Sequence, residues 1–330
     1  MVDNSPNDAD DGWTVIEIQV PAASEDMASW VLIFSGASGC EVVAKEEEGQ
    51  TDGSPLSEVA EELEESNGKR LDPVVDDQVF IRASYPSEAV TTEQLQRVAA
   101  LLEEYGFSKS ISSMRVFNLP HEDWLAKWKE GFEHFPVGDS FLVCPVWQRE
   151  LLTAEQTSQR KIIYIDPGMA FGTGLHATTQ FCLRMIEKYS PEGTILDVGT
   201  GSGILAIATI LNNNASRAVA LDTDPVAIEN AHLCLTANDL KDEVELVTAS
   251  LEAVSGRKFN AILSNLTAED NVALLPDYVS LLESNGIVIC AGILTEKSET
   301  VENTARELGF NVGLKEVSGM WTGLVLSGPN

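Results

Sequence analysis

The fold of this 330-residue chain is decided by the stretch Ile195-Leu196-Asp197-Val198-Gly199-Thr200-Gly201-Ser202-Gly203. Its first four residues read as a buried strand in which an acid precedes the last position. The glycines that follow, Gly199, Gly201 and Gly203, let the backbone turn sharply and approach a ligand with no side chain between them. A helix is predicted to begin at Gly203. The dinucleotide-binding pattern G-x-G-x-x-G would need its third glycine at the next position, where Ile204 stands, so the stretch departs from that pattern.

Strands and helices alternate on both sides of this loop. Such alternation predicts a mostly parallel sheet covered by helices on both faces, with ligands bound at the carboxyl ends of its strands. The predicted strands are 141–145, 161–165, 194–198, 218–221, 244–247, 261–264 and 286–291, and the predicted helices are 179–188, 225–238, 271–282 and 296–308.

An acid stands at the tip of the second strand after the loop. Asp222 follows Ala218-Val219-Ala220-Leu221, at the spacing where a carboxylate accepts hydrogen bonds from both hydroxyls of a ribose. The alternative is that this segment caps the next helix, since an acid before Pro225 starts a helix well. Both roles are compatible if Asp224 caps the helix while Asp222 binds the ribose.

The N-terminal half has a different organisation. Residues 13–120 follow the order strand, helix, strand, strand, helix, strand, which predicts a small ferredoxin-like α+β domain. Residues 1–12 form an acidic tail that we expect to be disordered, and the acidic, polar residues 45–77 read as an insertion loop. A linker helix is predicted over 121–135, and its two tryptophans on one face indicate an anchor in a core or, alternatively, a stacking surface. The second domain then covers 136–330.

Composition narrows the possible partners. The net charge of −31 argues against binding to nucleic acid, whose phosphates would be repelled. No run of about 18 uncharged apolar residues is found, and the N-terminus lacks the features of a secretory or transit signal. The four histidines show no metal-ligand spacing. We therefore expect a cytoplasmic monomer that binds no membrane and no metal.

Several longer motifs carry a family resemblance. The loop matches D-x-G-x-G-x-G, the glycine loop of methyltransferases with a seven-stranded sheet. Ahead of it stands Asp166-Pro167-Gly168-Met169-Ala170-Phe171-Gly172-Thr173-Gly174-Leu175-His176-Ala177-Thr178-Thr179, and further matches are 122–128, Ser264-Asn265-Leu266 and Ala291-Gly292-Ile293-Leu294. With these motifs the sequence resembles PrmA, the family of ribosomal protein L-eleven methyltransferases.

The resemblance implies a fold, a reaction and a set of site residues. The fold is α/β, a seven-stranded Rossmann-like methyltransferase domain preceded by a small α+β domain that recognises the substrate. The reaction transfers methyl groups from S-adenosylmethionine to lysine side-chain and N-terminal amines of ribosomal protein L-eleven. The implied donor contacts are Thr179, Gly199, Asp222 and Asn265, with Asp197, Gly201 and Gly203 completing the loop, and the implied reaction-centre residues are Phe171, Gly172, Thr173, His176 and Asn265.

Some alternatives stay open at this point. His176 reads either as a base or wall of the site or as a structural histidine, and Phe171 either faces the sulfonium or packs in the core. Thr200 stands where many members have Cys, and the insertion 45–77 has no expected counterpart. The motif Asn-Pro-Pro-Tyr is absent after 261–264, which disfavours glutamine and adenine as acceptors. The remaining alternatives for function are methylation of another protein lysine or a small molecule, and donor binding without catalysis.

Overall fold

The computed structural model describes residues 13–37, 39–43, 78–86, 90–119, 133–166, 174–212 and 217–329. The acidic tail 1–12, the whole insertion 45–77 and residues 121–132 of the predicted linker helix lie outside these ranges. The chain divides into two compact units, Met1–Phe132 and Glu133–Asn330. The prediction of a helix through residue 135 was wrong at its end, because residues 133 and 134 are not helical and Phe135 begins a strand.

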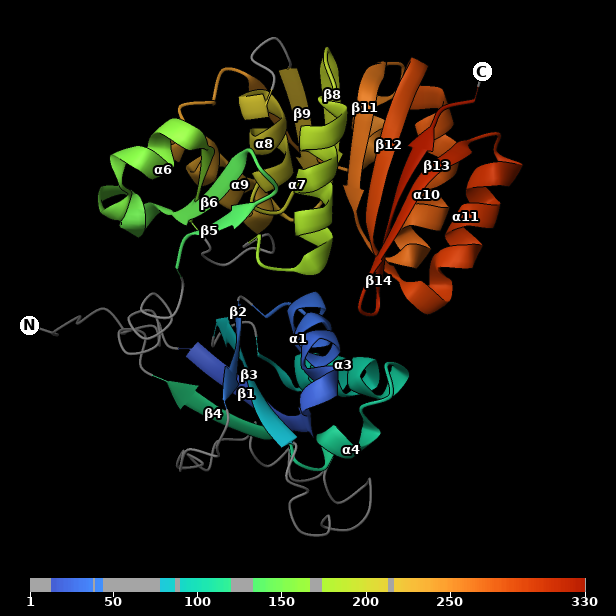
Figure 1. Cartoon of the computed structure of the whole chain (residues 1–330). Coiled ribbons are helices and arrows are strands. Elements are labelled where there is room, and N and C mark those ends of the chain that lie inside the picture. Colours follow the sequence, from blue (N-terminus) through green and yellow to red (C-terminus); the bar gives the residue numbers. More distant parts are fainter. Residues whose placement is uncertain are drawn as a thin grey trace, which may run out of the picture. The chain divides into compact units, whose positions relative to one another are not determined.

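The described residues of the N-terminal unit form an antiparallel sheet with strand order β2-β3-β1-β4. Helices α1 and α3 pack together on one face of it (Figure 1). At its centre the buried carboxylate of Glu17 accepts hydrogen bonds from Arg82, at 2.7 Å, and Arg115, at 3.2 Å. The elements are β1 (Trp13–Pro21), α1 (Glu25–Phe34), β2 (Gly39–Val43), β3 (Gln78–Pro86), α3 (Thr92–Glu104), α4 (Ser108–Ile111) and β4 (Arg115–Leu119).

The C-terminal unit is built on a larger sheet with strand order β10-β9-β8-β11-β12-β14-β13. Neighbours from β10 to β12 run parallel, and β14 is antiparallel to both β12 and β13. The strands are β8 (Thr194–Val198), β9 (Arg217–Asp222), β10 (Val244–Thr248), β11 (Phe259–Asn265), β12 (Leu282–Leu294), β13 (Asn311–Ser318) and β14 (Trp321–Ser327).

Helices cover both faces of this sheet (Figure 1). In α9, α10 and α11 the buried residues recur at intervals of three and four, which turns one apolar stripe toward the sheet, whereas α8 is buried on all sides. One group comprises α7 (Ala177–Tyr189), α8 (Ile204–Asn212) and α9 (Pro225–Ala237), and the other comprises α10 (Ala268–Leu281) and α11 (Ser298–Glu307).

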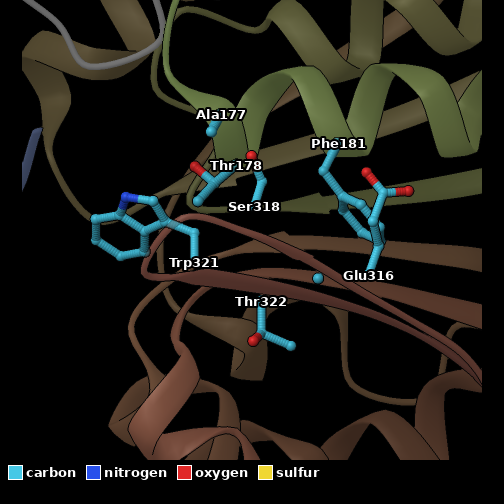
Figure 2. A pocket seen from close by; sticks show the side chains of 8 residues that line it. Ala177, Thr178, Phe181, Glu316, Ser318, Trp321 and Thr322 are labelled. Carbon is cyan, nitrogen blue, oxygen red and sulfur yellow. The ribbon is translucent and has the colours of Figure 1, made fainter.

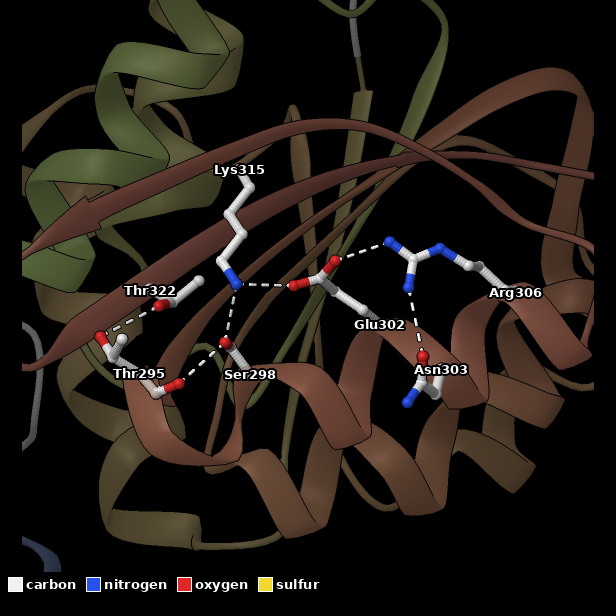
Figure 3. A network of polar contacts seen from close by, with 7 residues as sticks. All are labelled: Thr295, Ser298, Glu302, Asn303, Arg306, Lys315 and Thr322. Carbon is white, nitrogen blue, oxygen red and sulfur yellow. Dashed lines mark hydrogen bonds and ion pairs between the residues drawn. The ribbon is translucent and has the colours of Figure 1, made fainter.

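A polar network joins α11 to the antiparallel edge of the sheet (Figure 3). Lys315 of β13 donates to Glu302, at 2.7 Å, and to Ser298, at 2.9 Å. Arg306 donates to the second oxygen of Glu302 at 2.7 Å. Hydrogen bonding from Lys315 is the main reason that the pKa of Glu302 is lowered. The network therefore fixes the last helix on the sheet.

A small sheet of order β5-β6-β7 precedes α7. Its strands are β5 (Phe135–Val137), β6 (Phe141–Pro145) and β7 (Lys161–Ile165), and α6 (Ala154–Gln159) lies between the last two. In the larger sheet the direction of chain progression reverses between β8 and β11, which are neighbours. Open α/β sheets bind ligands at such a reversal, outside the carboxyl ends of the strands.

Candidate active site

The glycine loop leaves β8 and enters α8 with an unusual backbone. Gly199, Gly201 and Gly203 have φ angles of 66°, 54° and 79°, in the left-handed region that costs other residues about 1–2 kcal/mol each. The amides of Gly199 and Thr200 donate to the carbonyl oxygen of Leu221 at 2.9 and 3.0 Å. This turn fixes the loop against the end of β9, so the sequence pattern and the backbone requirement agree.

Asp197 is buried at the base of this loop, with 1% of its surface exposed. One of its oxygens accepts from the Thr200 hydroxyl at 2.7 Å and from the Ala206 amide at 3.2 Å. Burial raises the pKa of Asp197 to about 6. These contacts hold the loop to the first turn of α8. A contact from Asp197 to the donor stays a prediction, and the described geometry gives this side chain a structural task.

Asp222 ends β9 beside the loop and is half-buried. One carboxylate oxygen accepts from the Gly201 amide and the other from the Asp224 amide, both at 3.0 Å. Asp224 caps α9 by accepting from the Val226 amide at 2.8 Å. Asp224 thus caps the helix as the sequence suggested. Asp222 is fixed against the loop with further acceptor capacity on each oxygen, and its contact to a ribose stays a prediction.

Asn265 and Thr179 meet although they are 86 residues apart in the sequence. The Asn265 amide nitrogen, at the end of β11, donates to the Thr179 hydroxyl of α7 at 3.2 Å. Its amide oxygen is buried and finds no hydrogen-bond partner among the described residues. A buried polar atom of this kind is costly unless a ligand or water satisfies it. This oxygen therefore marks a point where a bound molecule would form a hydrogen bond.

His176 is the N-cap of α7. Its Nδ1 lies 2.7 Å from the Thr178 hydroxyl and accepts from the Thr178 amide at 3.4 Å. The ring packs edge-on against Trp321 with centroids 4.8 Å apart. These contacts favour the structural interpretation of His176, and a role in catalysis stays a prediction.

The pocket in Figure 2 lies between α7 and the β13–β14 hairpin, close to this histidine. Its walls combine apolar and polar side chains, and none of the predicted donor contacts is among them. The lining residues are Ala177, Thr178, Phe181, Glu316, Ser318, Trp321, Thr322 and Gly323.

Three predicted residues, Phe171, Gly172 and Thr173, lie outside the described residues. The position that follows them is closely packed. A Cβ atom on Gly174, whose φ is 81°, would come within 2.9 Å of Ile204 and 3.3 Å of Phe135. The chain therefore re-enters the described structure at a point fixed against the start of α8.

Leu266 is a residue whose place in the site the sequence alone did not reveal. A Cβ atom on Gly199 would lie 2.6 Å from the Leu266 side chain, so the leucine occupies the space that this glycine leaves free. The only signal in the sequence was its place beside Asn265 in the segment Ser264-Asn265-Leu266.

Comparison with known proteins shows the family of the chain. Residues 12–328 match the family model described as "Ribosomal protein L11 methyltransferase (PrmA)". The relative of that name from Bacillus cytotoxicus is 32% identical over 328 residues, which cover 95% of this chain and 98% of the relative. The relative from Alkaliphilus oremlandii is 33% identical over 250 residues, 74% of this chain and 78% of the relative.

A solved structure extends the comparison to the fold. The ribosomal protein L11 methylase from Lactobacillus delbrueckii subsp. bulgaricus matches with a TM-score of 0.56 and 32% identity. The match covers 60% of this chain and all of that chain. The sequence that carries the glycine loop, the acid that ends β9 and the asparagine that ends β11 is thus similar to these proteins over nearly its whole length. The chain belongs to the ribosomal protein L11 methyltransferase family.

Proposed function

We propose that this chain transfers methyl groups from S-adenosylmethionine to amines of ribosomal protein L11. The observation that carries the proposal is the convergence of three features at the carboxyl ends of neighbouring strands. They are the left-handed glycine loop after β8, the carboxylate of Asp222 after β9 and the buried oxygen of Asn265 after β11. The donor supplies an activated methyl group when it is bound.

The described residues suit this donor. Asp222 is held by two backbone amides and retains acceptor capacity for the ribose hydroxyls. The glycine loop presents backbone without side chains where a ligand approaches closely. Thr179 fixes the amide nitrogen of Asn265, so the Asn265 oxygen is left to accept a hydrogen bond from a bound group. We assign Thr179, Gly199, Asp222 and Asn265 to the donor site on these grounds, with Gly201 and Gly203 shaping the loop.

The acceptor amine must be uncharged to attack a methyl group. A lysine amine has a reference pKa near 10.4, and removal from water lowers that pKa because the charged form is disfavoured. The Asn265 oxygen is suited to accept a hydrogen bond from a neutral amine. Such a bond would orient the lone pair of the amine nitrogen. Positioning and desolvation then supply most of the rate enhancement.

We assign recognition of the protein substrate to the N-terminal unit. The strand order β2-β3-β1-β4 with α1 and α3 on one face supports a ferredoxin-like fold, and no predicted reaction-centre residue falls within it. We further propose that the enzyme acts as a cytoplasmic monomer that does not bind nucleic acid. Within the described ranges, no helix is long and apolar enough to cross a membrane.

A truncation tests this division of labour. A fragment of residues 121–330 should bind S-adenosylmethionine with the affinity of the full chain and methylate ribosomal protein L11 much more slowly. Methyl transfer is measured for both proteins at equal donor saturation. If the fragment works at the full-length rate, the catalytic pocket alone selects the acceptor and the N-terminal unit has another role.

A further inference from the structure

A buried polar cluster lies next to Asn265, on α10 and β11. Its members, Ser264, Asn271 and Tyr278, are all completely buried. The Tyr278 hydroxyl donates to the Ser264 hydroxyl at 2.9 Å, and the Ser264 hydroxyl donates to the amide oxygen of Asn271 at 2.8 Å. The motif Ser264-Asn265-Leu266 therefore has a second function besides carrying Asn265: its serine connects the strand to the helix that follows.

The other end of the Asn271 side chain holds the loop after Asn265. Its amide nitrogen donates to the carbonyl oxygens of Leu266, at 2.8 Å, Thr267, at 2.9 Å, and Ala291, at 3.2 Å. Carbonyl oxygens only accept hydrogen bonds, so the orientation of this amide is fixed by its surroundings. One side chain thus ties the two residues after Asn265 to the end of β12.

The same peptide is confined by packing. A Cβ atom on Gly292, whose φ is 78°, would lie 2.3 Å from the carbonyl oxygen of Leu266. The Leu266 side chain also fills the space beside Gly199. These contacts explain why the sequence has Ala291-Gly292 here. The missing side chain of Gly292 allows the end of β12 to approach the Leu266 peptide, and the carbonyl of Ala291 accepts one of the hydrogen bonds from Asn271, which together form a clamp on the loop.

We infer that Asn271 is a positioning residue for methyl transfer, which fixes the Asn265–Thr267 segment so that the Asn265 oxygen faces the acceptor amine. The inference rests on the role proposed above for Asn265. A core position in a helix is ordinarily filled by an apolar side chain. An amide there is justified by its hydrogen bonds, which specify the path of the loop more closely than apolar packing does.

The test compares variants that differ in what they remove. Asn271→Leu keeps the branched shape of the side chain, although its methyl groups are larger than the amide, and removes the hydrogen bonds to the loop. Ser264→Ala weakens the same clamp and carries the test if Asn271→Leu does not fold. Leu275→Ala is the matched control, because Leu275 is buried on the same helix one turn later and makes no contact of this kind. All three are made in the full chain, alone and combined with Asn265→Ala.

The expected readout is kcat for methylation of ribosomal protein L11 at saturating donor, together with the melting temperature. Asn271→Leu should lower kcat about ten- to hundredfold, the loss that small misplacement of a reacting group causes, and Ser264→Ala should lower it several-fold. In the Asn265→Ala background both should lower kcat less than twofold further. Leu275→Ala should lower the melting temperature and keep kcat within twofold.

Three results would overturn the inference. The first is a normal kcat in Asn271→Leu and Ser264→Ala. The second is the same fall in kcat in the Asn265→Ala background, which would indicate a general structural effect. The third is a normal kcat in Asn265→Ala alone, which would show that the proposed role of Asn265 itself is wrong.

Discussion

The carboxylate of Asp222 should be the strongest polar contact to the donor, and Asp222→Asn removes its charge while keeping its shape. Each oxygen is already held by one backbone amide at 3.0 Å and has capacity for one ribose hydroxyl. In the variant one of these amides would face the side-chain NH₂ group instead. Charge-assisted hydrogen bonds contribute about 1.5–3 kcal/mol, so the Kd for S-adenosylmethionine should rise about 10- to 150-fold.

Isothermal titration calorimetry measures this change, and a neighbouring acid gives the control. Asp224→Asn keeps the cap of α9, because Asn and Asp cap helices equally well, and should leave Kd within twofold. A donor analogue without the ribose hydroxyls should bind the wild-type protein weakly. The Asp222→Asn variant should bind this analogue and S-adenosylmethionine with about equal affinity. A folded Asp222→Asn variant with wild-type affinity, or an equal loss in Asp224→Asn, would refute the reasoning.

Two further predictions concern stability. The pKa of Asp197 is raised by burial to about 6, above the usual value near 3.9, so the folded protein binds a proton between pH 4 and 6 that the unfolded chain does not. The free energy of unfolding of the wild type, measured relative to that of Asp197→Asn, should therefore rise by up to about 3 kcal/mol as the pH falls from 7 to 4. Urea titrations at several pH values that give the same difference between the two proteins would contradict this. Glu17→Gln removes the buried carboxylate that accepts from the buried Arg82 and from the partly exposed Arg115, and it should lower the free energy of unfolding by about 3–5 kcal/mol. Donor affinity should stay within twofold, and a large loss in calorimetry would show that the N-terminal sheet supports the donor site.

The α/β fold followed from local patterns. Alternating strands and helices and the glycine loop were sufficient to predict it, because each element carries its own periodicity and each turn its own residues. One misplaced element was the end of the linker helix, where Phe135–Val137 forms a three-residue strand. A strand this short has no readable alternation, since its pairing with β6 comes from residues outside the segment.

The sequence placed Asp222 and Asn265 at the ends of recognisable strands, and the structure has them there. Their partners were not. The hydrogen bond between Asn265 and Thr179 joins segments 86 residues apart, and the clamp formed by Asn271 depends on the path of a loop. The burial of Asp197 likewise depends on how the loop folds back over β8, whereas the family resemblance implied a ligand contact for it, which stays a prediction.

The central claim is tested most directly by following the methyl group. The full chain is incubated with S-adenosylmethionine carrying a labelled methyl group and with purified ribosomal protein L11, and the label is located by mass spectrometry. We predict label on lysine side-chain and N-terminal amines of L11, with the transfer strongly reduced but still measurable in Asn265→Ala. Unlabelled L11 in the presence of a protein that binds the donor, or label found only on another protein or a small molecule, would contradict the account.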